Sequence, residues 1–212
     1  MLTLALDLGT SSCRSALFDV RGRRLLDTTA QRSYELDTDK EGKAELDAGT
    51  VLHALQACIR TTLATHDGDR RLRAQPIAAV GTSCFGHSLI GADDGGRALT
   101  PIITWADSRM RRTAAMLRTK YDERKIHARS GCMIRASFWP AKLRWLAETQ
   151  PAVVKRVRQW MSPAEWLYQR FCGEVRSAHG MATGTGLYNP RTRAYDPALL
   201  SLAGVSERVL PI

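Results

Sequence analysis

The 212-residue sequence predicts an α/β domain whose sheet is not simply doubly wound. Residues 1–30 contain three apolar segments separated by tight turns, whereas a doubly wound sheet places a helix after its first strand. A segment with helical periodicity and a further apolar strand follow. The composition, 44% hydrophobic and 25% charged, is that of a globular domain long enough to bury a core.

The first predicted strands flank a turn rich in small residues. Leucines alternate with smaller residues over 2–6 and predict a half-buried strand that ends at Asp7. Residues 9–12 form a turn, and the apolar run 13–20 follows it. A second turn then leads to a third strand over 24–30.

A long helix and a second buried strand are predicted next. Asp47 is a plausible N-cap for a helix whose apolar residues recur between 51 and 63 at helical spacing. Residues 67–73 are polar and are expected to form a loop. The continuous apolar character of residues 77–82 is typical of a strand at the centre of a sheet.

The second half of the sequence is mainly helical. Short strand cores at 89–90 and 102–103 precede the helices. An amphipathic helix is expected over 141–148. Residues 162–165 form a capping box with proline at the first helical position, so a helix should begin there and end near Gly173.

The net charge of +10 invites a nucleic-acid partner, but the pattern does not support one. The densest basic stretch, residues 109–125, is typical of the solvated face of a helix. No recognition-helix, RNP or zinc-finger pattern accompanies it, so we expect no nucleic-acid partner. An anionic substrate would also suit this charge.

The sequence favours a cytoplasmic protein. No apolar stretch reaches the roughly 20 residues of a membrane span, and the first residues lack the pattern of a signal peptide. The five cysteines are far apart, odd in number and without a C-x-x-C pair, so they predict neither a disulfide framework nor a zinc site.

The strongest chemical signal is the segment Asp7-Leu8-Gly9-Thr10-Ser11-Ser12-Cys13-Arg14. Amides and hydroxyls of its turn can donate to phosphate oxygens, and Gly9 allows close approach of the backbone. Asp7 can hold Mg²⁺, and Arg14 can neutralise negative charge. The alternative is an ordinary hairpin turn of small residues, because short motifs need context. The segment is neither a P-loop nor a Rossmann turn.

A second signal combines residues 81–93 with residues 101–109. Each segment runs out of an apolar strand, the first into His87 and the second into Trp105 and Asp107. Imidazole and carboxylate groups bind sugar hydroxyls, and a flat indole covers the C–H face of a sugar. Taken alone, each residue is more ordinary: a core histidine, a core tryptophan and a helix cap.

Together these segments resemble the FGGY carbohydrate kinases in order and spacing. The resemblance covers nearly the whole chain and extends to later segments, so the combination is specific although each piece is weak. The matching segments are Asp7–Arg14, Ser83–Asp93, Trp105–Arg109, Gly131–Leu146, Thr183–Asn189 and Leu210–Pro211.

The resemblance implies a ribonuclease H-like (actin-type ATPase) α/β domain with a mixed sheet and flanking helices, C-terminally incomplete. Residues 1–212 would be the N-terminal domain of such a kinase, with a helical insertion at about 108–180 and with the C-terminal domain absent.

The resemblance also implies transfer of the γ-phosphoryl group of ATP to a sugar hydroxyl. The residues it assigns to the phosphates and Mg²⁺ are Asp7, Gly9, Thr10, Ser11, Ser12 and Arg14, with Asp7 nearest the metal. Those it assigns to the sugar pocket are His87, Trp105, Asp107 and Arg109, and Phe138 aligns near an aromatic substrate contact.

Within the family the sequence is most similar to the gluconokinase branch, and next to xylulokinases. His87 to Gly91, Thr104 to Arg109 and the run from Cys132 to Leu146 favour gluconokinases, apart from Arg135, where that branch tends to carry histidine. A small sugar or sugar acid is therefore the expected ligand.

The resemblance places the general base beyond residue 212, in a second domain. Gly68-Asp69 lies in a polar loop with no strand before it and is no substitute. Because phosphoryl transfer needs a carboxylate to orient the nucleophile, we expect the chain alone to be inactive. It would be an excised domain, a truncated product or half of a split kinase, with homodimerisation through an open sheet edge as a further expectation. The alternative is a non-catalytic module that binds a sugar or nucleotide, or a remnant of a kinase.

Overall fold

A computed structural model describes residues 1–211, which divide into two compact units. Unit 1 comprises Met1–Leu36 and Leu46–Phe85, and unit 2 comprises Asp37–Glu45 with the chain from Gly86 onward. The helical region expected at about 108–180 falls within unit 2. Over the described residues, no helix has the length and apolar character that crossing a membrane requires.

Unit 1 is built on a four-stranded mixed sheet in the order β3-β2-β1-β6. β1 (Leu2–Leu8) pairs antiparallel with β2 (Ser12–Asp19), and β2 pairs antiparallel with β3 (Ala30–Ser33). β6 (Ile77–Cys84) pairs parallel with β1, so the predicted mixed sheet is confirmed.

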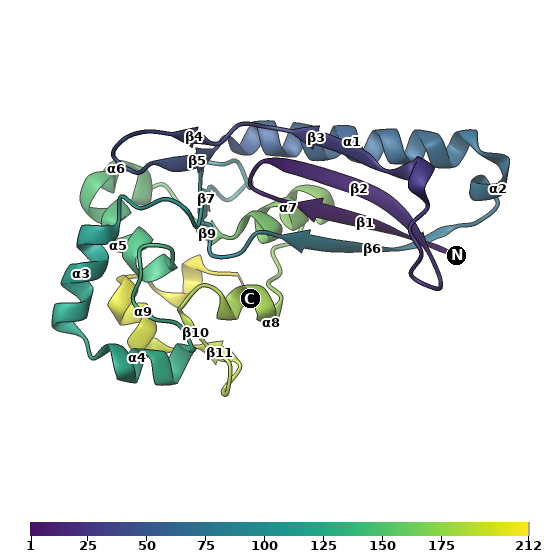
Figure 1. Cartoon of the computed structure of the whole chain (residues 1–212). Coiled ribbons are helices and arrows are strands. Elements are labelled where there is room, and N and C mark those ends of the chain that lie inside the picture. Colours follow the sequence, from purple (N-terminus) through teal and green to yellow (C-terminus); the bar gives the residue numbers. More distant parts are fainter. Residues whose placement is uncertain (212) are drawn as a thin grey trace. The chain divides into compact units, whose positions relative to one another are not determined.

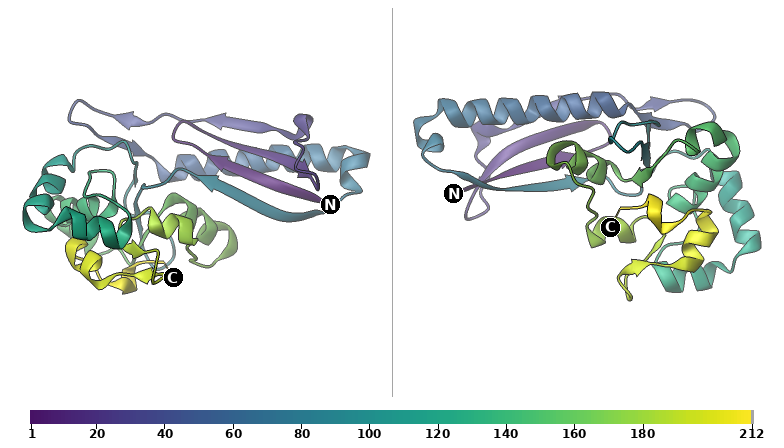
Figure 2. Two further views of the ribbon diagram at one scale, coloured as in Figure 1. Left: turned by 60° about the horizontal axis from the view of Figure 1, so that its bottom comes forward. Right: turned by 180° about the vertical axis from the view of Figure 1, so that it is seen from behind.

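Helix α1 (Ala48–Gly68) covers one face of this sheet (Figures 1 and 2). The Asp47 side chain accepts a hydrogen bond from the Thr50 amide, which confirms the predicted N-cap. The buried face of α1 presents Val51, Leu55 and Cys58, and the alternating leucines of β1 are buried as predicted. The opposite face of β1 and β2 carries Asp7 and Arg14 at directly paired positions.

The predicted third strand over 24–30 was wrong. The structure places a 3-10 turn, η1 (Leu26–Thr28), there, and β3 begins only at Ala30. The Thr28 hydroxyl donates to the Leu25 carbonyl at 2.6 Å and accepts from the Leu17 amide at 2.9 Å. A threonine side chain that satisfies backbone groups locally competes with strand pairing.

Two further expectations for unit 1 were also wrong. The polar loop over 67–73 contains a short helix, α2 (Arg70–Arg73), capped by the Asp69 carboxylate. The strand expected at the centre of the sheet, β6, is its edge strand, and residues 78–83 are all exposed. Alanine, glycine and small hydroxyl residues dominate this strand. The run therefore looked apolar because it contains no charged residues, and not because it contains many large side chains.

The strands of unit 2 are short. β4 (Asp37–Thr38), β5 (Ala44–Leu46, whose last residue is assigned to unit 1) and β8 (Ile102–Ile103) form one sheet. β7 (Ile90–Ala92) pairs with β9 (Gln159–Met161), and β10 (Tyr188–Asn189) pairs with β11 (Ala194–Tyr195). The strand cores predicted at 89–90 and 102–103 are thus confirmed as β7 and β8.

The helices of unit 2 supply most of its core. Helix α5 packs against α3 and α9, and Trp139, Leu146 and Leu199 are buried in the cluster they share. The bounds are α3 (Arg111–Lys120), α4 (Glu123–Ser130), α5 (Trp139–Thr149), α6 (Pro151–Val154), α7 (Pro163–Cys172), α8 (His179–Thr183), α9 (Pro197–Ala203) and the 3-10 turn η2 (Glu207–Val209).

Local capping signals were reliable in this unit. Ser162 and Glu165 form the predicted capping box at the start of α7, and Gly173 ends the helix in the left-handed region at φ 76°. The helix expected over 141–148 is present as α5, which begins two residues earlier, at Trp139, and ends one residue later, at Thr149.

Candidate functional site

In unit 1, the turn between β1 and β2 is held closed by three backbone-directed hydrogen bonds. The Gly9 amide donates to the Ser12 carbonyl at 2.9 Å. The Tyr34 hydroxyl donates to the Gly9 carbonyl at 2.6 Å, and the Tyr34 amide donates to the Ser11 carbonyl at 3.0 Å. Burial raises the pKa of Tyr34, so its phenol keeps its proton and remains a donor.

The same turn leaves hydrogen-bond donors open. Within residues 1–211, the amides and hydroxyls of Thr10 and Ser11 have no hydrogen-bond partner. Ser11 is exposed and Thr10 is half-buried. A Cβ at Gly9 would stand 3.3 Å from the Ser12 carbonyl oxygen, so this tight turn favours glycine. Successive open backbone amides of this kind can donate to the oxygens of an anion.

Asp7 and Arg14 lie beside this turn as a cross-strand pair. The Arg14 Nη1 donates to the Asp7 Oδ2 at 3.2 Å, and both side chains are about half exposed (50% and 51%). The Arg14 Nε also donates to Gln31 Oε1 at 3.1 Å, which fixes the guanidinium along the sheet. One carboxylate oxygen and part of the guanidinium therefore stay available at the strand end.

The residues of this turn could supply only some of the ligands of a metal ion, with phosphate and water supplying the others. Among the residues the structure describes, no group of three histidine, cysteine or acidic side chains could hold a metal ion. Mg²⁺ is commonly bound through one or two carboxylates together with phosphates and water. Asp7, half exposed beside open amide donors, fits that arrangement.

In unit 2, His87 adopts a constrained conformation. Its φ is 59°, in the left-handed region that non-glycine residues seldom occupy. Its Nδ1 lies 2.6 Å from the Gly184 carbonyl oxygen, and its ring meets Phe138 edge-on with centroids 4.7 Å apart. A carbonyl can only accept, so Nδ1 carries the proton and Nε2 of the neutral ring is an acceptor.

The predicted pocket residues of the second segment differ in accessibility. Trp105 is 51% exposed, so its indole is open to a ligand. Asp107 is 1% exposed, and its carboxylate accepts from the Ala44 amide at 3.1 Å and from the Arg109 amide at 3.1 Å. Asp107 does not cap α3, whose N-cap is Met110.

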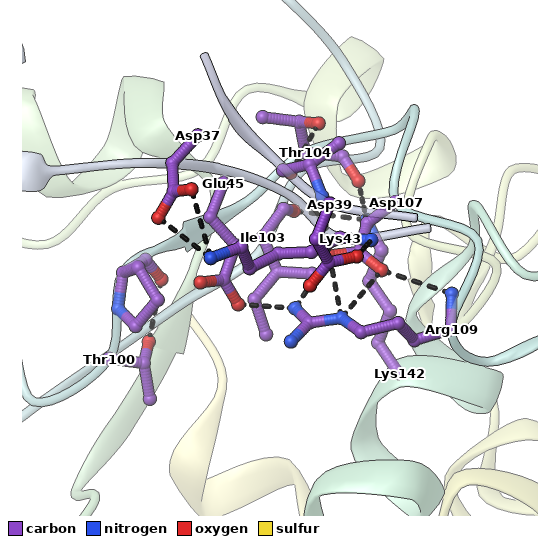
Figure 3. A network of polar contacts seen from close by, with 12 residues as sticks. Asp37, Asp39, Lys43, Glu45, Thr100, Ile103, Thr104, Asp107, Arg109 and Lys142 are labelled. Carbon is purple, nitrogen blue, oxygen red and sulfur yellow. Dashed lines mark hydrogen bonds and ion pairs between the residues drawn. The ribbon is translucent and has the colours of Figure 1, made fainter. Parts of the chain in front are cut away.

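Asp107 and Arg109 form the centre of a polar network (Figure 3). The Arg109 guanidinium donates to Asp107 Oδ2 at 2.6 Å and also to Glu45, and it lies 4.6 Å from the centre of the Trp145 ring. Ala44 and Glu45 belong to β5, so this network braces the 105–109 loop against the β4–β5 hairpin. The sugar-binding role of Asp107 and Arg109 stays a prediction.

The structure adds residues that sequence reasoning did not select. Lys142 is 0% exposed and donates to the carbonyls of His87, Ile103 and Thr104. The available signal was its position between Trp139 and Leu146 on the apolar stripe of α5. Glu45 and Gly184 gave no comparable signal, since their partners are distant in sequence.

The sequence pattern and these sites are consistent with one family. Residues 2–212 match the FGGY family of carbohydrate kinases, N-terminal domain. The chain belongs to this family. Its predicted resemblance to FGGY kinases is confirmed.

Relatives of this FGGY chain include kinases of both predicted branches. The xylulose kinase of Lactococcus lactis is 28% identical over 98% of this chain, and the gluconokinase of Bacillus subtilis is 25% identical over 96%. A crystal structure of gluconate kinase from Lactobacillus acidophilus superposes with a TM-score of 0.88 and 26% identity over 100% of this chain. The predicted ribonuclease H-like, actin-type fold is confirmed.

The chain spans about two fifths of the length of the relatives it matches. It covers 40% of the xylulose kinase, 38% of the gluconokinase and 42% of the gluconate kinase in the crystal structure. The chain therefore matches only part of these larger kinases, and the family model that it matches is that of the N-terminal domain.

Proposed function

We propose that this chain supplies the phosphate-binding turn and the sugar pocket of an ATP-dependent kinase that phosphorylates a hydroxyl of a sugar or sugar acid. Gluconate is the favoured substrate, with xylulose next, on the segments His87 to Gly91 and Thr104 to Arg109. The observation that carries the proposal is the open Thr10-Ser11 turn beside Asp7 and Arg14, in a chain that belongs to a carbohydrate kinase family.

In unit 1, the turn would hold the polyphosphate of ATP. Amides and hydroxyls of residues 9–12 would donate to phosphate oxygens, and Arg14 would neutralise part of their charge. Asp7 would hold Mg²⁺ directly or through water. Bound there, Mg²⁺ would neutralise charge on the phosphates and keep them in line for transfer.

In unit 2, His87 and Trp105 would make the direct contacts with the sugar. The acceptor Nε2 of His87 matches a hydroxyl donor, and the exposed indole of Trp105 matches an apolar C–H face. Asp107 and Arg109 complete the predicted pocket. Their ion pair supports the proposal because it fixes the loop that presents Trp105.

The proton of the attacking hydroxyl needs an acceptor, which we expect beyond residue 212. This chain would therefore bind both substrates but turn them over only together with a C-terminal kinase half. We expect it in the cytoplasm with a small-molecule partner and no nucleic acid. A non-catalytic sugar- or nucleotide-binding module is the alternative, and the same experiment distinguishes it.

The test combines calorimetric titration with an ADP-release assay. The chain is titrated with MgATP, gluconate, xylulose and glycerol, and ADP release is measured with and without a C-terminal half taken from a gluconokinase. We expect binding of MgATP and gluconate by the chain, and gluconate-dependent ADP release only in the mixture. Binding without turnover in any mixture would favour the module, and absence of all binding would refute the proposal.

A further inference from the structure

Lys142 places a cationic side chain where the surrounding helix is apolar. It lies on α5 at 0% exposure, on the same helix face as Trp139 and Leu146. Burying an ammonium group is costly unless its donors are satisfied. A methionine of similar volume would fill this space without that cost, so packing alone does not account for a lysine here.

The ammonium group is satisfied by backbone oxygen atoms. Nζ donates to the His87 carbonyl at 2.7 Å, to the Thr104 carbonyl at 2.9 Å and to the Ile103 carbonyl at 3.1 Å. These three acceptors match the three N–H donors of the charged form. Figure 3 shows Lys142 reaching toward Thr104 and Asp107 from α5.

The three carbonyls belong to two separate segments of unit 2. One segment contains His87, and the other contains Ile103 and Thr104, directly before Trp105. The two segments pair at Leu89 and Ile103 through hydrogen bonds of 3.0 and 2.9 Å, and the pairing continues away from His87, where Gly91 bonds with Leu99 and Thr100. Lys142 adds a further connection on the other side of the Leu89–Ile103 bridge, where the predicted sugar contacts begin.

The His87 end of this connection is conformationally demanding. Positive φ at a non-glycine residue persists only when its surroundings hold it in place. Within the described chain, the His87 carbonyl accepts a hydrogen bond only from Lys142. The ring is held separately by Gly184 and Phe138, and the Trp139 indole holds the next carbonyl, that of Ser88. Lys142 is therefore the contact at the His87 carbonyl itself.

We propose that Lys142 is a positioning residue for the sugar, whose ammonium group joins the His87 segment to the Thr104 segment and so sets the placement of His87 and Trp105. The proposal rests on the sugar pocket described under the proposed function. Lys142 would act through the backbone carbonyls and would not contact the sugar.

The test asks whether Lys142 holds the His87 and Thr104 segments in particular or stabilises unit 2 as a whole. Hydrogen–deuterium exchange is measured at about pH 6 on the full 212-residue chain carrying Lys142→Met, which keeps the volume of the side chain and removes its three donors. Lys120→Met, at an exposed lysine of α3 in the same unit, is the matched control. Lys142→Gln, which keeps two N–H donors, replaces the methionine variant if that variant does not fold.

We expect exchange to rise about tenfold or more in peptides covering 87–92 and 102–109, and to stay unchanged in α7 and in the β10–β11 hairpin. The glutamine variant should show a smaller rise in the same peptides, and the control should show none. A rise spread evenly over unit 2, or no rise at all, would overturn the proposal.

Ligand titration provides the second readout. Lys142→Met should weaken gluconate binding about tenfold and leave MgATP binding unchanged, because the nucleotide turn belongs to unit 1. Equal loss of both ligands, or no loss of gluconate binding, would contradict positioning. If the unmodified chain binds no sugar at all, the proposed function fails, while the exchange data still decide whether Lys142 fixes the two segments.

Discussion

At the scale of single residues, Asp7 combines a modest structural contact with a proposed ligand role. Its ion pair with Arg14 joins two half-exposed side chains at 3.2 Å, and such pairs contribute about 0–1 kcal/mol. The carboxylate is therefore dispensable for folding. Its value lies in the charge that it places beside the open donors of the Thr10-Ser11 turn.

Asp7→Asn should weaken MgATP binding about tenfold, because the amide no longer attracts the metal, and should change the free energy of unfolding by less than about 1 kcal/mol. Calorimetric titration with MgATP, repeated with ATP in EDTA, would measure the effect. The difference between the two titrations should disappear in the variant. Asp94→Asn, at an exposed carboxylate of unit 2, is the control, and equal MgATP affinity in Asp7→Asn would refute the metal role.

Lys142 gives the chain a pH dependence with a defined sign. Burial lowers the pKa of Lys142 to about 7, and the negative charge of Asp107 opposes this shift. A lysine in the unfolded chain has a pKa of about 10.4. Between these values the unfolded chain binds the additional proton, so this group makes the free energy of unfolding rise with pH above about 7 and adds no slope below it.

Urea unfolding of the wild-type chain and of Lys142→Met at several pH values from about 6 to 9.5 would measure this contribution. Other groups titrate equally in both proteins, so the wild type should gain stability relative to the variant as the pH rises. A difference that is constant with pH would show that the three carbonyl acceptors keep Lys142 protonated throughout.

The site also shows what residue-level reading could and could not provide. Asp7, His87 and Trp105 were found because each lies at the end of an apolar strand or shortly after it, and strand ends collect functional side chains. The burial of Asp107 could not be predicted, because its partner Ala44, and the Glu45 that pairs with Arg109, are more than 60 positions away in sequence. Charge patterns do not reveal such long-range pairing.

At the scale of secondary structure, local signals predicted the elements whose determinants are local. The N-cap at Asp47 and the capping box at Ser162 were both confirmed, because a cap needs only its own first turn. The strand predicted over 24–30 failed because the Thr28 hydroxyl bonds to Leu25 and Leu17. The edge position of β6 depends on which strands pair, and the sequence of β6 does not encode it.

Two strand glycines provide a matched prediction at this scale. A Cβ at Gly91 in β7 would lie 2.7 Å from a ring carbon of Trp160 and 2.8 Å from a methyl of Val157, whereas a Cβ at Gly81 in β6 would meet nothing within 4 Å. Both residues lie outside the positive-φ region. Only Gly91 therefore carries a packing requirement.

Gly91→Ala should lower the free energy of unfolding by about 1–3 kcal/mol, because Trp160 and Val157 are buried and must move to admit a methyl group. Gly81→Ala should be neutral or stabilise by up to about 1 kcal/mol, since alanine reduces the entropy of the unfolded chain. Urea denaturation of both variants measures the difference. Equal effects at the two positions would refute the packing argument.

At the scale of the whole molecule, the exposed edge of β6 and the charge of the chain act in opposite directions. Residues 78–83 are exposed, Val80 at 60%, and the outer edge of β6 has no partner strand among residues 1–211. An unprotected edge favours pairing with a second copy. The net charge of +10 opposes it through long-range repulsion, which salt screens beyond about 10 Å at 0.1 M.

Self-association of the 212-residue chain should therefore increase with salt concentration and should depend on β6. Val80→Lys places a charge on the open strand and should weaken association about tenfold, as measured by sedimentation velocity across salt concentrations. Val20→Lys adds the same charge at a side chain that is 75% exposed but lies just after β2, so it should change association little. If both variants weaken association equally, net charge and not the strand edge controls it, because the two proteins differ only in where the lysine stands.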